Sequence, residues 1–195
     1  GHLGGDVTHD KSEMLFTYVR DYVVEEPAVI PTLHIPAVDD AVFNNKDNPD
    51  DESRSGTCYY AHKYLAKGHK LTKHIIGATS LCHDIKRTPV EIAAILRKSE
   101  VLYCFEPSAI ITEARMCGCP VVMVPSDFLE NNLTLPLSGS GISLQLDSNS
   151  ILESKKNVAD FLNEHQMHID DSWVHIKDFC ILTQTEFETR ERKIG

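Results

Sequence analysis

The sequence predicts an α/β fold with a doubly wound parallel sheet, and one central segment carries most of this prediction. Residues 101–105 (VLYCF) form an apolar run that is too short for a helix and rich in β-prone residues, so we expect a buried strand. Residues 108–117 then space their apolar side chains as a helix does, up to a stop at Gly118. Residues 121–124 (VVMV) form a second buried strand. Strand, helix and strand make one βαβ unit, in which the two strands are parallel neighbours or near neighbours.

The rest of the chain supplies elements of the same kind. A helix is predicted for residues 88–99, because Thr88 can cap its start, Pro89 suits its first position and Glu91 completes a capping box. The other predicted elements are strands at 57–61 and 142–146, a strand in either 74–78 or 79–82, and helices at 11–25, 150–165 and 171–190. We therefore assign residues 1–27 to an N-terminal extension with a helix, and residues 28–195 to a Rossmann-like domain with C-terminal helices.

Composition excludes several classes of protein. A chain of 195 residues suits one domain with extensions, and its net charge of -10 argues against a nucleic-acid partner. No apolar run approaches the roughly 18 residues of a transmembrane segment, so none is predicted. The six cysteines do not form a disulfide framework, and with the ten scattered histidines they show no metal-binding spacing. Free thiols indicate a reducing cytoplasm.

Two carboxylates mark the predicted βαβ unit. Glu106 follows the first strand, at the edge where open α/β sheets bind ligands, and Glu113 lies in the next helix, whose side chains lean back toward that edge. Between them, the backbone N–H groups near Ser108 and Ala109 form a helix start suited to a phosphate. Carboxylates accept hydrogen bonds from hydroxyl groups. The segment therefore suits a ligand with a sugar at each end and phosphate between.

The residues of this segment resemble a known motif. Glu106-Pro107, Glu113-Ala114 and the run 117–122 (CGCPVV) are similar to the motif of the nucleotide-sugar-binding, C-terminal half of GT-B glycosyltransferases, particularly the large retaining group 1. The two glutamates are one residue closer together here than is usual in that group. The resemblance implies that Glu106 contacts the donor sugar as a catalytic residue and that Glu113 binds the ribose. The alternative is an ordinary buried βαβ unit with an incidental pair of glutamates.

Two lysines extend the resemblance. In the resembled enzymes the first strand leads to an Arg or Lys and then to a Lys-Gly, and these cations hold the donor diphosphate. Lys63 and Lys67-Gly68 match those positions, so the resemblance implies that they bind the diphosphate without a metal or other cofactor. The alternative is a solvated basic turn. His83-Asp84, after the second predicted strand, either reaches the same edge or lies on a loop surface.

The resemblance implies glycosyl transfer from a nucleotide sugar (a UDP- or GDP-sugar) to a saccharide or lipid-linked acceptor in bacterial surface-polysaccharide biosynthesis. A cytoplasmic location follows, with association at the inner face of the membrane left open. Since the chain has room for one half of such an enzyme, we expect an acceptor-binding domain upstream or on a separate chain, and donor binding without efficient transfer by this chain alone. The alternatives are a non-catalytic nucleotide-sugar-binding or scaffolding module and an epimerase of the same architecture.

Overall fold

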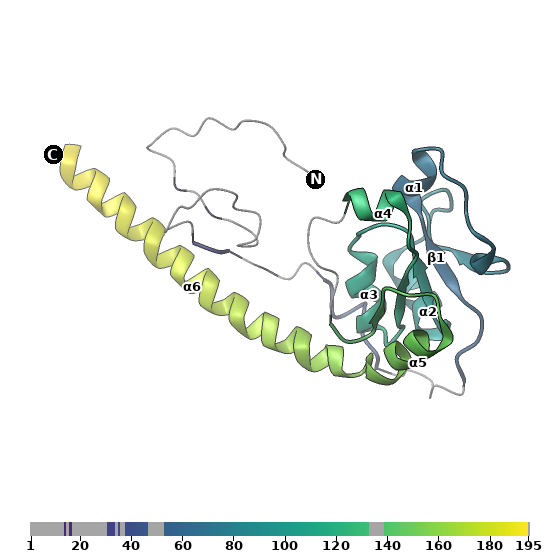
Figure 1. Cartoon of the computed structure of the whole chain (residues 1–195). Coiled ribbons are helices and arrows are strands. Elements are labelled where there is room, and N and C mark those ends of the chain that lie inside the picture. The colour runs from purple at the N-terminus through teal and green to yellow at the C-terminus, as the bar shows by residue number, and fades with distance from the viewer. Residues whose placement is uncertain are drawn as a thin grey trace. The chain divides into compact units, whose positions relative to one another are not determined.

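A computed structural model describes residues 14, 16, 31–33, 35, 38–46, 53–132 and 139–194. The chain divides into two compact units, one of residues Ala37–Gln166 and the other of Gly1–Pro36 with Met167–Gly195. Figure 1 draws the first unit as a sheet with helices on both sides. Among the described residues, no helix combines the length and the apolar character needed to cross a membrane.

The sheet has five parallel strands in the order β2-β1-β3-β4-β5. Their bounds are Cys58–Tyr60 (β1), Thr79–Ser80 (β2), Leu102–Cys104 (β3), Val121–Met123 (β4) and Ile142–Ser143 (β5). β3 and β4 are direct neighbours, with Leu102 opposite Val121. The predicted doubly wound, Rossmann-like α/β sheet is thus confirmed.

The helices of the described chain are α1 (His62–Ala66), the 3-10 helix η3 (Lys73–Ile75), α2 (Pro89–Lys98), α3 (Ile110–Met116), α4 (Asp127–Asn132), α5 (Ser148–Asn157) and α6 (Asp160–Ile194). The start of α2 is as predicted. The Glu91 backbone N–H donates to the Thr88 hydroxyl over 3.3 Å, and the Thr88 N–H donates to the Glu91 carboxylate over 2.7 Å. The sequence signals for this helix are therefore satisfied by local hydrogen bonds.

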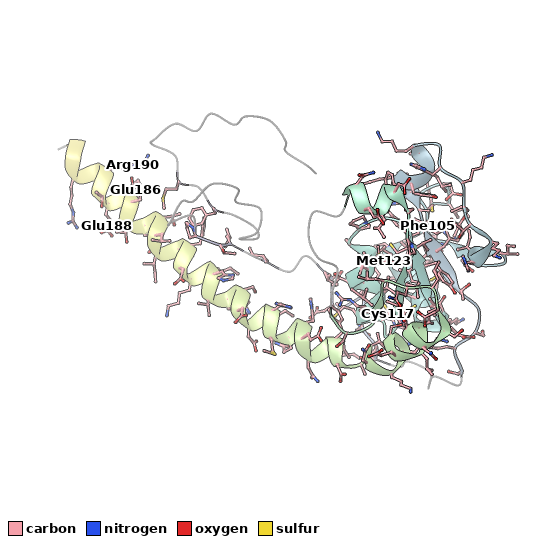
Figure 2. All side chains as sticks on the ribbon, in the orientation of Figure 1. Phe105, Cys117, Met123, Glu186, Glu188 and Arg190 are labelled. Atoms are coloured by element: carbon pink, nitrogen blue, oxygen red, sulfur yellow. The ribbon has the colours of Figure 1, made fainter. Side chains whose placement is uncertain are left out.

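Buried side chains cover both faces of the sheet. One face packs on α2 and α3, where Cys104 of β3 belongs to the same core as Leu96 and Ala114. The other face packs on α1, where Phe105 belongs to a smaller core with Tyr64. Figure 2 labels Phe105 among these buried side chains. Strands that are buried on both faces read as continuous apolar runs, which is why the sequence marks β3 and β4 so clearly.

Two helices are predicted at 150–165 and 171–190, and the structure also has two over this stretch, but the predicted break between them is in the wrong place. α5 ends at Asn157, and α6 then runs unbroken through residues 160–194, which contain no glycine or proline to end it. Pairs of opposite charge one turn apart support its last turns: Glu186 with Arg190 (Figure 2), and Glu188 with Arg192. Without a glycine or proline, the backbone of this stretch can keep its helical hydrogen bonds throughout.

Other predictions have different outcomes. Of the two candidate second strands, 79–82 contains β2, whereas 74–78 overlaps η3 and ends in a turn at Gly77, whose φ is 82°. The helix predicted for 11–25 lies outside the described residues except for Met14 and Phe16, neither of which is helical. The short helices α1 and α4 were not predicted.

Candidate functional site

The strand order places the candidate site beyond the carboxyl ends of the strands, between β1 and β3. β1 lies between β2 and β3, so the chain leaves β1 in one direction and later proceeds from β3 in the other. In open α/β sheets, ligands bind outside the carboxyl ends of the strands at such a reversal. Lys63 follows β1 and Glu106 and Ser108 follow β3, so three of the residues singled out by the sequence lie beyond these two adjacent strand ends.

Glu106 is turned into the protein. Its side chain is 1% exposed, and its Oε2 accepts a hydrogen bond of 2.7 Å from the backbone N–H of Tyr64, in the first turn of α1. α1 has no cap of its own, since Ala61 precedes it and offers no side-chain acceptor. A carboxylate at a helix start satisfies a free N–H and complements the helix dipole. Glu106 therefore fastens α1 to the end of β3.

The second oxygen of the Glu106 carboxylate has no such bond. Oε1 is buried and has no hydrogen-bond partner among the described residues. An unpartnered buried acceptor is costly, so a donor group supplied by a ligand would be favourable there.

The side chain of Tyr64 also holds α1 in place. Its ring lies 5.0 Å from the ring of Phe105 and 5.6 Å from that of Phe128, measured between centroids. Its hydroxyl donates to the Lys70 carbonyl over 3.2 Å. The backbone and the side chain of Tyr64 thus both anchor α1, and α1 is the element that carries the predicted lysines.

Lys63 and Lys67 lie one turn apart on α1. Lys67 is the residue that ends the helix, and its N–H donates to the Lys63 carbonyl over 3.0 Å. Both side chains are exposed, and neither forms an ion pair with another described residue. Residues four apart on a helix share a face, so the two ammonium groups make one exposed positive strip.

The remaining predicted residues lie at the start of α3. Ser108 is half-buried and Ala109 is exposed, and their N–H groups donate to no acceptor in the described part of the chain. Glu113 lies in the first turn of α3 and is half-buried. Burial raises the pKa of Glu113, and no hydrogen bond to its carboxylate offsets this effect. Glu113 is thus a carboxylate without a protein donor, close to free N–H groups.

The sequence predicts no role for His62 and two alternatives for His83, and the structure brings these two residues together. Their rings are 4.2 Å apart between centroids and tilted by 37°. The His83 ring is also 6.0 Å from the ring of Tyr60, the last residue of β1. The sequence does hold one indication of this pair, because each histidine closely follows a strand, and parallel strands end at the same side of a sheet.

The structure also places the potential metal-binding side chains and the cysteine thiols. The described residues contain no group of three or more His, Cys, Asp or Glu side chains that could hold a metal ion. All six cysteines are free and five are buried. Burial raises the pKa of Cys104 to about 12 and that of Cys117 to about 11, so these thiols stay neutral and are poor nucleophiles.

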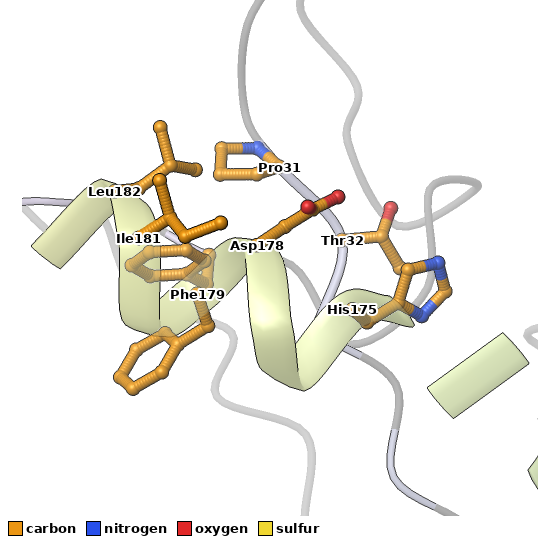
Figure 3. Close-up of a pocket in the computed structure, with 8 residues that line it drawn as sticks. Pro31, Thr32, His175, Asp178, Phe179, Ile181 and Leu182 are labelled. Carbon is orange, nitrogen blue, oxygen red and sulfur yellow. The ribbon is translucent and has the colours of Figure 1, made fainter. Parts of the chain in front are cut away.

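A hollow of about 430 Å³ lies in the unit that contains most of α6 (Figure 3). Its lining combines apolar side chains with two titratable ones, His175 and Asp178. Phe16 and Phe179, which also line it, meet edge to face with their ring centroids 4.8 Å apart. The hollow includes none of the residues that the sequence singled out.

The edge beyond β1 and β3 therefore combines an exposed positive strip, free backbone N–H groups and a half-buried carboxylate without a protein donor. Cations and N–H groups bind phosphate oxygens, and carboxylates accept hydrogen bonds from hydroxyl groups. Comparisons of the chain with protein-family models, with curated proteins and with solved structures give no match.

Proposed function

We propose that this chain is the donor-binding part of a glycosyltransferase and binds a nucleotide sugar beyond the carboxyl ends of β1 and β3. One observation carries the proposal: the strand order reverses between β1 and β3, and Lys63, Glu106 and Ser108 follow those two strands. The sequence resemblance to the GT-B donor-binding half assigns these same positions to the nucleotide sugar.

The diphosphate of the donor would be held by positive charge. Lys63 and Lys67 present two exposed ammonium groups on one face of α1. A lysine neutralises a phosphate as a point charge, although it lacks the two-pronged geometry of arginine. The N–H groups of Ser108 and Ala109 supply further donors. No metal or other cofactor is needed for this part of the proposal.

The hydroxyl groups of the donor would be held by the two glutamates. Glu113 has no protein hydrogen-bond donor, and the ribose hydroxyls would supply one. The unpartnered Oε1 of Glu106 would accept a hydrogen bond from the donor sugar. Because that oxygen is buried, this contact requires a local movement of the chain around Glu106.

In the reaction, the bond between the anomeric carbon and the diphosphate oxygen breaks, and the acceptor oxygen bonds to that carbon and loses its proton. Negative charge grows on the leaving diphosphate, and the two lysines would stabilise it. The acceptor, a saccharide or a lipid-linked saccharide, and the group that takes its proton would belong to an acceptor-binding domain upstream or on a separate chain. We place this reaction in bacterial surface-polysaccharide biosynthesis at the cytoplasmic face of the membrane.

The test is the affinity of the chain for UDP and GDP, measured by isothermal titration calorimetry. Charge-assisted hydrogen bonds contribute about 1.5–3 kcal/mol, so Lys63→Ala and Lys67→Ala should each weaken binding on the order of tenfold. Exposed lysines contribute little to folding, so Tm should hardly change. The matched control is Lys156→Ala, at an exposed lysine on α5. Its neighbour Lys155 pairs with Glu100, which precedes β3, so this lysine lies near the amino end of that strand and away from the candidate site.

Two results would contradict this proposal. If wild type binds neither UDP nor GDP, the chain is not a nucleotide-sugar-binding domain of this kind. If it binds them as tightly after both lysine substitutions as before, the lysines are solvated surface residues. Donor binding without transfer, even when the acceptor-binding half is present, would favour the non-catalytic module.

A further inference from the structure

His62 and His83 form a pair that the proposed function does not use. His62 is the first residue of α1 and half-buried, and His83 lies in the turn after β2 and is exposed. Their ring centroids are 4.2 Å apart. The residues lie 21 positions apart in the sequence, and the parallel pairing of β1 with β2 brings them together.

The histidine pair is continuous with the candidate site. The His83 ring lies 6.0 Å from the ring of Tyr60, at the carboxyl end of β1. Burial raises the pKa of the Tyr60 phenol, and an interaction with the Ser108 side chain opposes that rise. Side chains thus link the end of β2, across β1, to the segment between β3 and α3. Lys63 follows His62 in the sequence, at the start of α1.

Imidazole chemistry indicates what such a pair binds. A ring protonated on both nitrogens donates two hydrogen bonds and carries a positive charge, and it is attracted to the face of a neutral ring in contact with it. A phosphate oxygen complements both this charge and the N–H donors.

Other groups near the pair do not change this assignment. The carboxylate of Asp84, which follows His83, is 3.5 Å from the Ser80 hydroxyl, its hydrogen-bond donor. The imidazole rings face each other in a tilted stack, and no third metal ligand accompanies them among the described residues. The geometry therefore favours an anion over a metal ion.

We propose that His62 and His83 bind a phosphate oxygen of the donor diphosphate, beside Lys63, and help the site to distinguish a nucleoside diphosphate from a nucleoside. This inference rests on the proposed function, because it adds contacts to the same ligand at the same edge. The resemblance assigns diphosphate binding only to the lysines and to the segment between β3 and α3. The inference adds the histidines that follow β1 and β2.

The experiment measures the affinities of the chain for UDP, GDP and the two corresponding nucleosides by isothermal titration calorimetry. His62→Ala and His83→Ala should each weaken nucleoside diphosphate binding on the order of tenfold, because each removes a ring N–H that donates to a phosphate oxygen. Nucleoside binding should not change. His83→Phe keeps a ring against His62 but has no N–H, so it should bind as weakly as His83→Ala. His74→Ala, at an exposed histidine in η3, is the matched control and should bind as wild type does.

The outcomes separate this inference from the proposed function. If wild type and the His62 and His83 variants bind UDP or GDP equally while Lys63→Ala binds more weakly, the histidine pair lies outside the site and the proposed function stands. If His83→Phe binds like wild type, the ring acts through packing and the phosphate contact is wrong. If wild type binds no nucleoside diphosphate, the proposed function fails first. Thermal unfolding of each variant identifies any loss that comes from misfolding.

Discussion

Glu106 and Glu113 belong to one βαβ unit, yet their surroundings differ. Glu106 is 1% exposed and accepts a 2.7 Å hydrogen bond from the Tyr64 backbone, which attaches α1 to the sheet. Glu113 is half-buried, and burial raises its pKa with no hydrogen bond to compensate. Glu106 thus has one oxygen bound by a protein donor and one oxygen without a partner among the described residues, whereas no protein donor binds the Glu113 carboxylate there. Substitutions of these residues and of their neighbours test this difference.

The largest effect is expected from Glu106→Ala. It leaves the buried N–H of Tyr64 without an acceptor, which costs about 1–3 kcal/mol. For a chain of this size, a loss of about 2 kcal/mol lowers Tm by roughly 4–8 °C. Thermal unfolding followed by circular dichroism measures the change. Glu106→Gln is the matched control, because its amide oxygen can still accept from Tyr64 and its volume is nearly the same.

Glu106 has a second assigned role, and the same variants address it. If Glu106→Ala were as stable as wild type, the bond to Tyr64 would contribute nothing, and the carboxylate would be free to serve a sugar. If Glu106→Gln kept its stability but lost sugar binding, the single carboxylate would support both the fold and the ligand.

An intermediate effect is expected from Arg115→Met, two positions after Glu113 on α3. Arg115 donates to the Ser140 carbonyl over 3.1 Å, and its guanidinium lies 3.7 Å from the centre of the Phe161 ring. Methionine keeps the aliphatic packing but loses both interactions, so we expect a loss of about 1 kcal/mol, or roughly 2–4 °C in Tm. Arg115→Lys, which keeps only the charge, should lie between the two. Equal Tm values for all three proteins would contradict a structural role for Arg115.

The smallest change in stability, and one of opposite sign, is expected from Glu113→Gln. A carboxyl pKa that folding raises means that the folded state holds its proton more tightly than the unfolded chain. The stability contribution of Glu113 therefore falls as pH rises through that pKa, and at pH 7 the wild type bears the cost of a partly buried charge. Glutamine removes this cost, so the variant should gain slightly in Tm at pH 7 and less at pH 4.

The ligand measurement completes this test of Glu113. Glutamine replaces a charged acceptor by a neutral one, so nucleoside binding should weaken on the order of tenfold if Glu113 holds the ribose. A lower Tm at pH 7 together with unchanged nucleoside affinity would show that Glu113 supports the fold as Glu106 does. In that case the proposed difference between the two glutamates would not hold.

The elements that the sequence predicts correctly are marked by residues within or next to them. β3 and β4 are apolar runs bounded by Pro107, Gly118 and Pro120, and α2 begins with its own capping box. α1 has no such signal, because it is a five-residue helix without a side-chain cap. Short isolated helices are unstable, so α1 depends on contacts with distant residues. No local pattern reports those contacts.

The same distinction applies to the candidate site. The positions of Lys63 and Glu106 after parallel strands are readable from the sequence, but the direction of a side chain is not. The hydrogen-bond partner of Glu106 is a backbone N–H 42 residues earlier, and any residue type except proline could have supplied it. The pairing of His62 with His83 likewise depends on which strand lies beside β1.

Both edges of the sheet end in very short strands, β2 and β5, each of two residues. An exposed edge strand offers unpaired N–H and carbonyl groups to which a strand of another molecule can add, and long flat edges are a common origin of aggregation. Two residues present too little backbone for a foreign strand to pair in a stable register. The short outer strands thus protect the sheet against edge-to-edge association, and a variant that extended β2 or β5 would create that hazard.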